Sequence, residues 1–219
     1  MTTGSQLYTE YARRYVEMLA GKAVYHDYER PMIRRLAGDV SGAAVLDLGC
    51  GPGAHLPWLK QSGASSVTAV DASDAFLEIV RRDHPSVETT RIDLNDGLSV
   101  LPSEKYDLAI SSLVLHYVTD WYALLQDVRR VLRRGGRFVL STHHPFNPHI
   151  LQSVQNYLET CIVDDRFGPP GQEVDVRYYH RPLHEIVNPF ARAGLRIERM
   201  EEPPFESQPL FLFIAARRG

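Results

Sequence analysis

Short apolar runs alternate with stretches of helical periodicity along the chain. The run AAVLDL is apolar on both sides of a strand, which is typical of a parallel sheet covered by helices on each face. The stretches between such runs carry apolar residues three and four positions apart, the period of a helix that packs on one side. The pattern predicts strands at 43–48, 66–71, 87–92, 106–113, 137–142, 195–200 and 209–217, and helices at 5–20, 28–37, 54–61, 75–82, 121–132 and 182–193.

The order of these elements predicts an α/β fold of the Rossmann-like, doubly wound type. Strands that alternate with helices form mostly parallel sheets with helices on both faces. The last two strands are joined by a short proline-rich link, so we expect them to form a hairpin. The expected sheet therefore has seven strands, with an antiparallel strand at the C-terminus.

Composition and charge exclude several classes of function. The chain has 24 Lys and Arg against 27 Asp and Glu, so no overall positive field favours a nucleic-acid partner. No apolar run approaches the roughly 18 residues of a membrane span, and the N-terminus lacks the apolar segment of a secretion signal. Two cysteines are too few for a disulfide framework. We therefore expect a cytoplasmic protein with no membrane partner.

A glycine-rich segment, LDLGCGPG at 46–53, follows the first predicted strand and precedes a helix. In doubly wound sheets the ligand lies beyond the carboxyl ends of the strands, where glycines let the backbone come close to it. The glycines follow the spacing G-x-G-x-G, whereas dinucleotide-binding proteins have G-x-G-x-x-G. Asp47 lies two residues before the first glycine, and its carboxylate suits an ammonium or sulfonium group better than a pyrophosphate.

Two further acids follow the next two strands. Asp71 ends the second strand, where a carboxylate can accept hydrogen bonds from ribose hydroxyls. Asp93 and Leu94 follow the third strand, where a carboxylate can accept from an adenine amino group beside an apolar contact. Three strand ends at one edge of the sheet thus carry three acids.

Together these features resemble the class I S-adenosylmethionine (SAM)-dependent methyltransferases. The later stretches YDLAISSLVLHYVTD and LLQDVRRVLRRGGRFVLS are similar to the fourth and fifth strand region of that family. The resemblance is close over residues 40–143 and loose at the closing strands. Within the family the chain looks most like small-molecule enzymes of the methyltransferase-11 type, because it has a YxxYERP-like segment at 25–31, His144-Pro145 and the segment HRPL at 180–183.

The resemblance implies SAM as the cofactor, S-adenosylhomocysteine as its product and a small molecule as the methyl acceptor. It also implies which residues contact the cofactor. They lie in the N-terminal helix, in the glycine turn and at the ends of the second, third and fourth strands: Tyr15, Asp47, Gly49, Cys50, Gly51, Asp71, Ala72, Asp93, Leu94, Ser111 and His116.

Methyl transfer is an in-line displacement, so the protein mainly has to align the acceptor and exclude water. A hydroxyl acceptor also needs a base, and His143 or His144 at the end of the fifth strand is the candidate, because neutral imidazole is available near pH 7. Neighbouring histidines on a strand point to opposite faces, and the chain has no metal-ligand spacing. We therefore expect no metal site.

The chain is expected to form one methyltransferase domain over 1–219, with a helical cap at 1–40, a SAM-binding core at 41–143 and closing elements at 183–219. Residues 146–182 are far longer than the usual link of about 2–6 residues. We interpret this segment as a lid over the acceptor, with an apolar wall of aromatic residues and with Tyr178 and His180 needed for turnover; the alternative is a helix and strand that cover a sheet edge. The aromatic residues are Phe146, Tyr157, Phe167, Tyr178 and Tyr179.

Three other functions stay open at this stage. An NAD-dependent oxidoreductase has a similar sheet, but the glycine spacing differs and the chain has no recognisable Tyr-x-x-x-Lys pair. A non-catalytic SAM-binding module carries the same motifs. A nucleic-acid methyltransferase directed at amino groups has an Asn-Pro-Pro-Tyr-like tetrapeptide after the fourth strand, which is absent here. The sequence decides neither the acceptor nor the oligomeric state.

Overall fold

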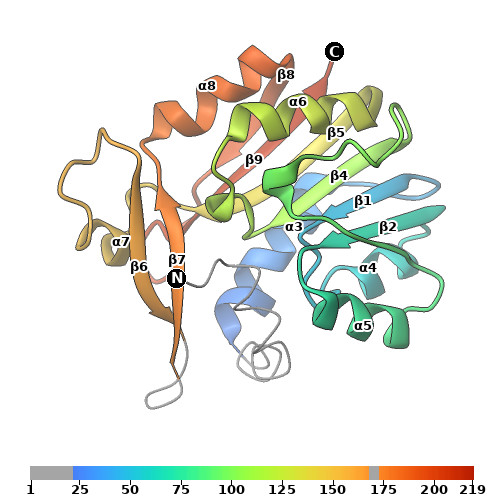
Figure 1. Cartoon of the computed structure of the whole chain (residues 1–219), viewed down its shortest axis with the longest axis horizontal. Coiled ribbons are helices and arrows are strands. Elements are labelled where there is room, and N and C mark those ends of the chain that lie inside the picture. Colours follow the sequence, from blue (N-terminus) through green and yellow to red (C-terminus); the bar gives the residue numbers. More distant parts are fainter. Residues whose placement is uncertain (1–21, 168–172) are drawn as a thin grey trace.

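A seven-stranded sheet forms the centre of the molecule (Figure 1). The structure is a computed structural model that describes residues 22–167 and 173–219, so the helix predicted at 5–20 lies outside the described residues. The first five strands pair in parallel, whereas β9 is antiparallel to both neighbours, which confirms the predicted doubly wound fold. Their order is β3-β2-β1-β4-β5-β9-β8, with bounds β1 (Ala44–Leu48), β2 (Ser66–Asp71), β3 (Glu88–Arg91), β4 (Tyr106–Ser112), β5 (Leu132–His143), β8 (Leu195–Glu201) and β9 (Phe211–Arg218).

Helices cover both faces of this sheet, as its apolar strands require. Leu46 faces the side covered by α6 and α8, and its neighbour Val45 faces the side covered by α3, α4 and α5 (Figure 1). The helices predicted at these places are all present, and their ends differ by at most two residues from the prediction. Their bounds are α3 (Arg30–Ala37), α4 (Leu56–Gln61), α5 (Asp74–Asp83), α6 (Trp121–Val131) and α8 (Leu183–Ala193).

The start of β5 differs from the prediction, which began this strand at 137. The strand begins directly after α6, at Leu132, because Leu132 has extended backbone and pairs with Tyr106. The next pair in the ladder is Leu108 with Arg137, so the residues at 133–136 bulge out between the two pairs. Gly135 has a φ of 75° there, which a glycine adopts without strain. The two glycines at 135 and 136 therefore bend a strand instead of ending a helix.

The long segment after β5 folds into structure of its own. It contains α7 (Pro148–Leu151) and an antiparallel hairpin of β6 (Cys161–Phe167) and β7 (Val174–His180). This hairpin is a separate two-stranded sheet and stands beside the main sheet in Figure 1. Its inner face packs Val163, Val176 and Tyr178 against Ile150. Alternate residues of both strands therefore point away from this small core.

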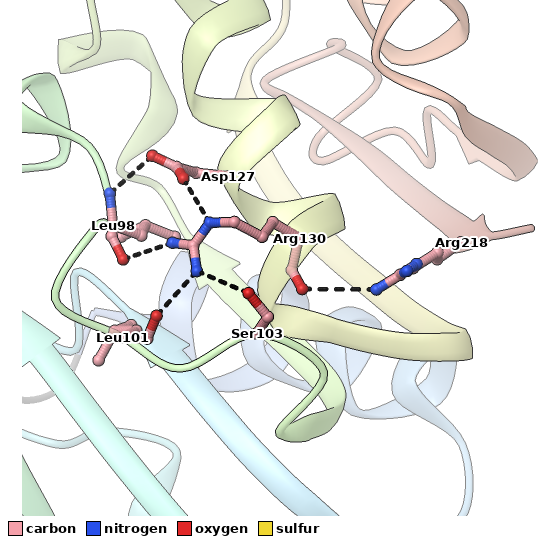
Figure 2. A network of polar contacts seen from close by, with 6 residues as sticks. All are labelled: Leu98, Leu101, Ser103, Asp127, Arg130 and Arg218. Carbon is pink, nitrogen blue, oxygen red and sulfur yellow. Dashed lines mark hydrogen bonds and ion pairs between the residues drawn. The ribbon is translucent and has the colours of Figure 1, made fainter.

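A guanidinium group ties α6 to the loop that follows β3 (Figure 2). Arg130 donates hydrogen bonds to the carbonyl of Leu98 (2.7 Å), to the carbonyl of Leu101 (2.8 Å) and to Asp127 (3.0 Å). Asp127 in turn accepts a hydrogen bond from the backbone N–H of Leu98 at 2.8 Å. The loop reaches this anchor directly after residues 93–96, so the anchor also fixes the end of β3.

We expect Arg130→Met to lower the free energy of unfolding by about 1–3 kcal/mol, because two carbonyl groups and Asp127 lose their donor. Arg134→Met is the matched control: Arg134 is exposed, and its change should stay within about 0.5 kcal/mol. Urea denaturation of both variants measures the difference. Equal midpoints for the two variants would show that the network contributes nothing.

Candidate active site

A cavity of about 460 Å³ lies beyond the carboxyl ends of β1, β2, β3 and β4. Its floor is formed by the glycine turn after β1 and by the residues that end the other three strands. One wall comes from the π-helix η1 (Val24–Glu29), and another comes from the β6–β7 hairpin through Ile162, Arg177 and Tyr179. Segments far apart in the sequence therefore meet around one cavity that is partly open to solvent.

The glycine turn has the backbone that its sequence predicts. Gly49, Gly51 and Gly53 have φ values of 70°, 52° and 90°. A Cβ atom on Gly49 would lie 2.5 Å from the Val114 side chain, so only glycine fits under the loop after β4. At Gly51 no atom lies within 4 Å of that position, and the residue lines the cavity. The backbone at Gly51 is thus open to close approach by a ligand.

Two backbone N–H groups hold the carboxylate of Asp71. The N–H of Gly51 donates to Oδ2 at 2.8 Å, and the N–H of Ser73 donates to Oδ1 at 2.9 Å. These bonds favour the charged form, but burial has the larger effect and raises the pKa of Asp71. The carboxylate is oriented and keeps lone pairs for a ligand.

Asp93 is oriented by its own turn. Its Oδ1 accepts hydrogen bonds from the backbone N–H and the side-chain amide of Asn95, both at 3.0 Å. This caps the short 3₁₀ helix η2 (Leu94–Asp96), which buries Leu94. Carboxylate and apolar side chain lie next to each other on the cavity wall, as expected for contact with a flat heterocycle.

Asp47 is the most unusual acid of the cavity. Its side chain is 1% exposed, and none of the residues that the structure describes donates a hydrogen bond to Oδ2. Burial raises the pKa of this carboxyl to about 8, with further increases from the nearby charges of Asp71 and Glu29. A buried acid without a donor is costly unless a ligand supplies one.

Comparisons with known proteins agree with this geometry. The family model described as a methyltransferase domain, Methyltransf_11, matches residues 46–140. A crystal structure of an S-adenosylmethionine-dependent methyltransferase from Mesorhizobium loti superposes with a TM-score of 0.71 at 30% identity. The match covers 91% of this chain and 100% of that protein. The chain belongs to the class I SAM-dependent methyltransferases.

Curated relatives of this methyltransferase act on different acceptors. The demethylmenaquinone methyltransferase of Lactococcus lactis is 31% identical over 143 residues, which are 63% of this chain and 57% of that enzyme. The tRNA U34 carboxymethyltransferase of Pseudoalteromonas translucida is 34% identical over 107 residues, which are 47% of this chain and 33% of that enzyme. These relatives share a methyl- or carboxymethyl-transfer activity by name but differ in acceptor, so similarity leaves the acceptor open.

The cavity of the methyltransferase fits SAM, which carries a ribose, an adenine, a sulfonium and an α-ammonium group. Three features of the cavity are complementary to these groups. The backbone at Gly51 is open to close approach, the carboxylate of Asp71 is oriented, and Oδ2 of Asp47 can still accept a hydrogen bond. Eight of the residues predicted to contact the cofactor line the cavity together. They are Asp47, Gly49, Cys50, Gly51, Asp71, Ala72, Asp93 and Leu94.

Two other predicted site residues, Ser111 and His116, do not line this cavity. Ser111 is fully buried, and its hydroxyl donates to the carbonyl of Leu48 at 3.0 Å, so it ties β4 to β1. Tyr15 lies outside the described residues. His116 is buried, and its ring stacks on that of His143 with centroids 3.9 Å apart.

Neither candidate base reaches the cavity. Burial lowers the pKa of His143 to about 4, and its ring lies between His116 and Tyr178. His144 holds Glu202, with 2.6 Å between Nε2 and Oε1. Both line a second, much smaller cavity of about 10 Å³ beneath the hairpin. The physical reason is that Tyr178 of the hairpin packs on the His143 ring, while the His144 ring is held by Glu202 and by the backbone N–H of Phe146.

Several residues of the cavity were missed in the sequence. Glu29 is 1% exposed and accepts hydrogen bonds from the hydroxyls of Ser112 and Ser141. His55 lies beyond the glycine turn, and both its ring nitrogens are buried without a partner. Burial and two nearby arginines lower the pKa of His55 to about 3, so its ring is neutral. Glu29 lies in the YxxYERP-like segment that carries the family resemblance, but that segment gave no role for it, and no local sequence signal marks His55.

Metal-ligand clusters and membrane-spanning helices can be sought directly in the described residues. In residues 22–167 and 173–219, no group of three or more His, Cys, Asp or Glu side chains is arranged to hold a metal ion. None of the helices described has the length and apolar character needed to cross a bilayer.

We expect Asp47→Asn to stabilise the ligand-free methyltransferase at pH 8 but not at pH 4. Because the pKa of Asp47 is about 8 in the folded protein and about 3.9 in an unfolded chain, the folded state keeps a proton that the unfolded state releases. The natural protein therefore has the full stability from this proton below pH 4 and loses it as the pH rises to 8. The Asn side chain does not titrate, so the variant loses no stability through this position.

Thermal midpoints of both proteins between pH 4 and 9 measure this difference. The difference between the two thermal midpoints should increase up to pH 8 and then stay constant. Each kcal/mol of stability should correspond to about 2–4 °C in the midpoint. A constant gap, or a variant that is less stable throughout, would contradict the assigned protonation of Asp47.

Proposed function

We propose that this enzyme transfers the methyl group of SAM to a small-molecule acceptor held beneath the β6–β7 hairpin. The observation that carries the proposal is the composition of the cavity: acids from the strand ends form one side, and the hairpin closes the other with Ile162 and Tyr179. In this proposal residues 41–143 form the cofactor-binding core and residues 146–182 form the acceptor lid.

The order of the acids suggests how the cofactor lies. Asp93, Asp71 and Asp47 follow β3, β2 and β1, which are neighbours in that order. We assign adenine to Asp93 and Leu94, and ribose to Asp71. The methionine part then runs along Asp47 and the glycine turn toward β4. Its methyl group faces the hairpin side of the cavity.

The hairpin supplies a wall suited to an organic acceptor. Ile162 pairs with Tyr179 in the ladder, and both lie on the face opposite to the buried Val163 and Tyr178. Ile162 is 51% exposed, which is high for a large apolar side chain. The Tyr179 hydroxyl lies 3.4 Å from Thr119 Oγ1 across the cavity mouth. Of the five aromatic residues expected to wall the acceptor, Tyr179 alone lines the cavity among those whose side chains are described.

The reaction needs alignment more than acid–base chemistry. SAM supplies an activated methyl group, and the acceptor attacks it in line with the bond to sulfur. In our proposal the glycine turn and the acids fix the cofactor, while the hairpin positions the acceptor and excludes water. His143 and His144 are not assigned as bases, since neither lines the cavity.

A panel of phenols, quinols, carboxylic acids, amines and unmodified tRNA tests the acceptor class, with release of S-adenosylhomocysteine as the readout. We expect release with a small molecule and none with tRNA. Release with tRNA alone would overturn the small-molecule proposal. A lack of release with any acceptor would favour the non-catalytic SAM-binding module.

Asp71→Asn should weaken SAM binding by about 1–3 kcal/mol, because charge-assisted hydrogen bonds to the ribose are lost. Asp83→Asn is the control, as this acid is partly exposed at the end of α5 and pairs with Arg82. Calorimetry with SAM measures both variants. An unchanged affinity for Asp71→Asn would remove the ribose assignment.

Ile162→Ser and Tyr179→Ala should each lower turnover at least about tenfold while the SAM affinity changes less than about twofold, because they contact the acceptor rather than the cofactor. Leu158→Ser is the control, since Leu158 is 66% exposed and does not line the cavity.

The sequence-based expectation had been that Tyr178 and His180 serve this purpose. Both are buried on the opposite face of β7, so changes there test folding instead. If Ile162→Ser lowered the SAM affinity as much as the turnover, the hairpin could not be a wall that contacts the acceptor alone.

A further inference from the structure

Two carboxyl groups of the cavity are removed from water and incompletely bonded. Glu29 and Asp47 are each 1% exposed, and both line the cavity. They come from different parts of the fold: Asp47 from β1, and Glu29 from the last residue of η1. They are close enough for the charge of Glu29 to raise the pKa of Asp47.

The hydrogen bonds of Glu29 are one-sided. The hydroxyls of Ser112 (2.7 Å) and Ser141 (2.5 Å) both donate to Oε1. The hydrogen bonds that Glu29 accepts in the described part of the chain both go to Oε1, and Asp47 Oδ2 is buried with no donor among the same residues. The serines thus hold the carboxyl group in one orientation and leave one oxygen for another partner.

Burial has the larger effect on Glu29 and raises its pKa, although the charges of Arg30 and Arg34 favour the ionised form. A cation that donates hydrogen bonds would complete the bonding of both carboxyl groups. Buried carboxylates are stable only when paired and hydrogen-bonded. An ammonium group carries three N–H donors and can serve both oxygens, whereas a sulfonium carries charge but no donor. The amino-acid end of SAM is the source of such a group in this cavity.

We propose that Glu29 joins Asp47 in binding the α-ammonium group of SAM, which makes Glu29 a cofactor-binding residue outside the glycine turn and the strand ends. This rests on the proposed orientation of the cofactor, with its methionine part along Asp47. Ser112 and Ser141 position Glu29 from the ends of β4 and β5. Cofactor binding then fastens η1 to the edge of the sheet, because one ligand group bridges both.

Binding of SAM and three of its analogues distinguishes the contribution of the ammonium group from that of the other parts of the cofactor. S-adenosylhomocysteine lacks the sulfonium, decarboxylated SAM lacks the carboxylate, and 5′-methylthioadenosine lacks the whole amino-acid end. Glu29→Gln should weaken SAM, S-adenosylhomocysteine and decarboxylated SAM by about 10- to 100-fold each. The affinity for 5′-methylthioadenosine should stay unchanged, which also shows that the variant is folded.

Glu185→Gln is the control, because Glu185 is an exposed acid on α8, and it should bind all four ligands as the natural protein does. A loss for SAM but not for S-adenosylhomocysteine would overturn the proposal in favour of the sulfonium. An equal loss of affinity for all four ligands would mean that Glu29 has a structural role. An unchanged affinity for all four would show that Glu29 does not bind the cofactor. The titrations need no acceptor, so a failed search for methyl transfer leaves their result intact.

Discussion

The burial of Asp47 and Glu29, two members of a row of four carboxyl groups, is the constraint on which the rest of this structure depends. Acids at the ends of β1, β2 and β3 and a fourth from η1 meet at one edge of the sheet, and the innermost of them, Asp47, is raised to a pKa of about 8. Such crowding destabilises the ligand-free protein. A positively charged ligand offsets the free energy that this crowding costs. Acids with shifted pKa values therefore gather at functional sites.

The elements around the cavity follow from this constraint. Glycines at the turn after β1 let a ligand approach the backbone, and Val114 closes the turn from the loop after β4. The hairpin lines the opposite side of the cavity, and its inner face is anchored by Tyr178 on the rings of His116 and His143. These two histidines are thus part of the support for the hairpin. Their ring stacking requires that they stay neutral, in line with the lowered pKa of both.

Features that are local in sequence could be predicted, and features made by packing could not. Asp71 and Asp93 were found because a strand and the turn after it are recognisable within ten residues, and their position at the sheet edge follows from the parallel order. Glu29 lies in a helical stretch, where an acid is usually exposed. It is buried because η1 lies against the ends of β4 and β5, more than 80 residues away in the chain.

The histidines and the hairpin show the same limit in different ways. His143 and His144 stand at the expected strand end, but Tyr178 of the hairpin packs on the ring of His143, and the ring of His144 is bonded to Glu202. In the hairpin, the choice between Tyr178 and Tyr179 depends on one step of strand register, which decides which ring faces the cavity. Neighbouring aromatic residues give no signal for that step.

A crystal structure with S-adenosylhomocysteine bound tests the account most directly. It predicts adenine beside Asp93, ribose hydroxyls on Asp71, and the α-ammonium nitrogen within hydrogen-bond distance of both Asp47 Oδ2 and Glu29 Oε2, with the sulfur toward Ile162 and Tyr179. An amino-acid end that points away from Glu29, or a sulfur atom that faces solvent, would contradict it.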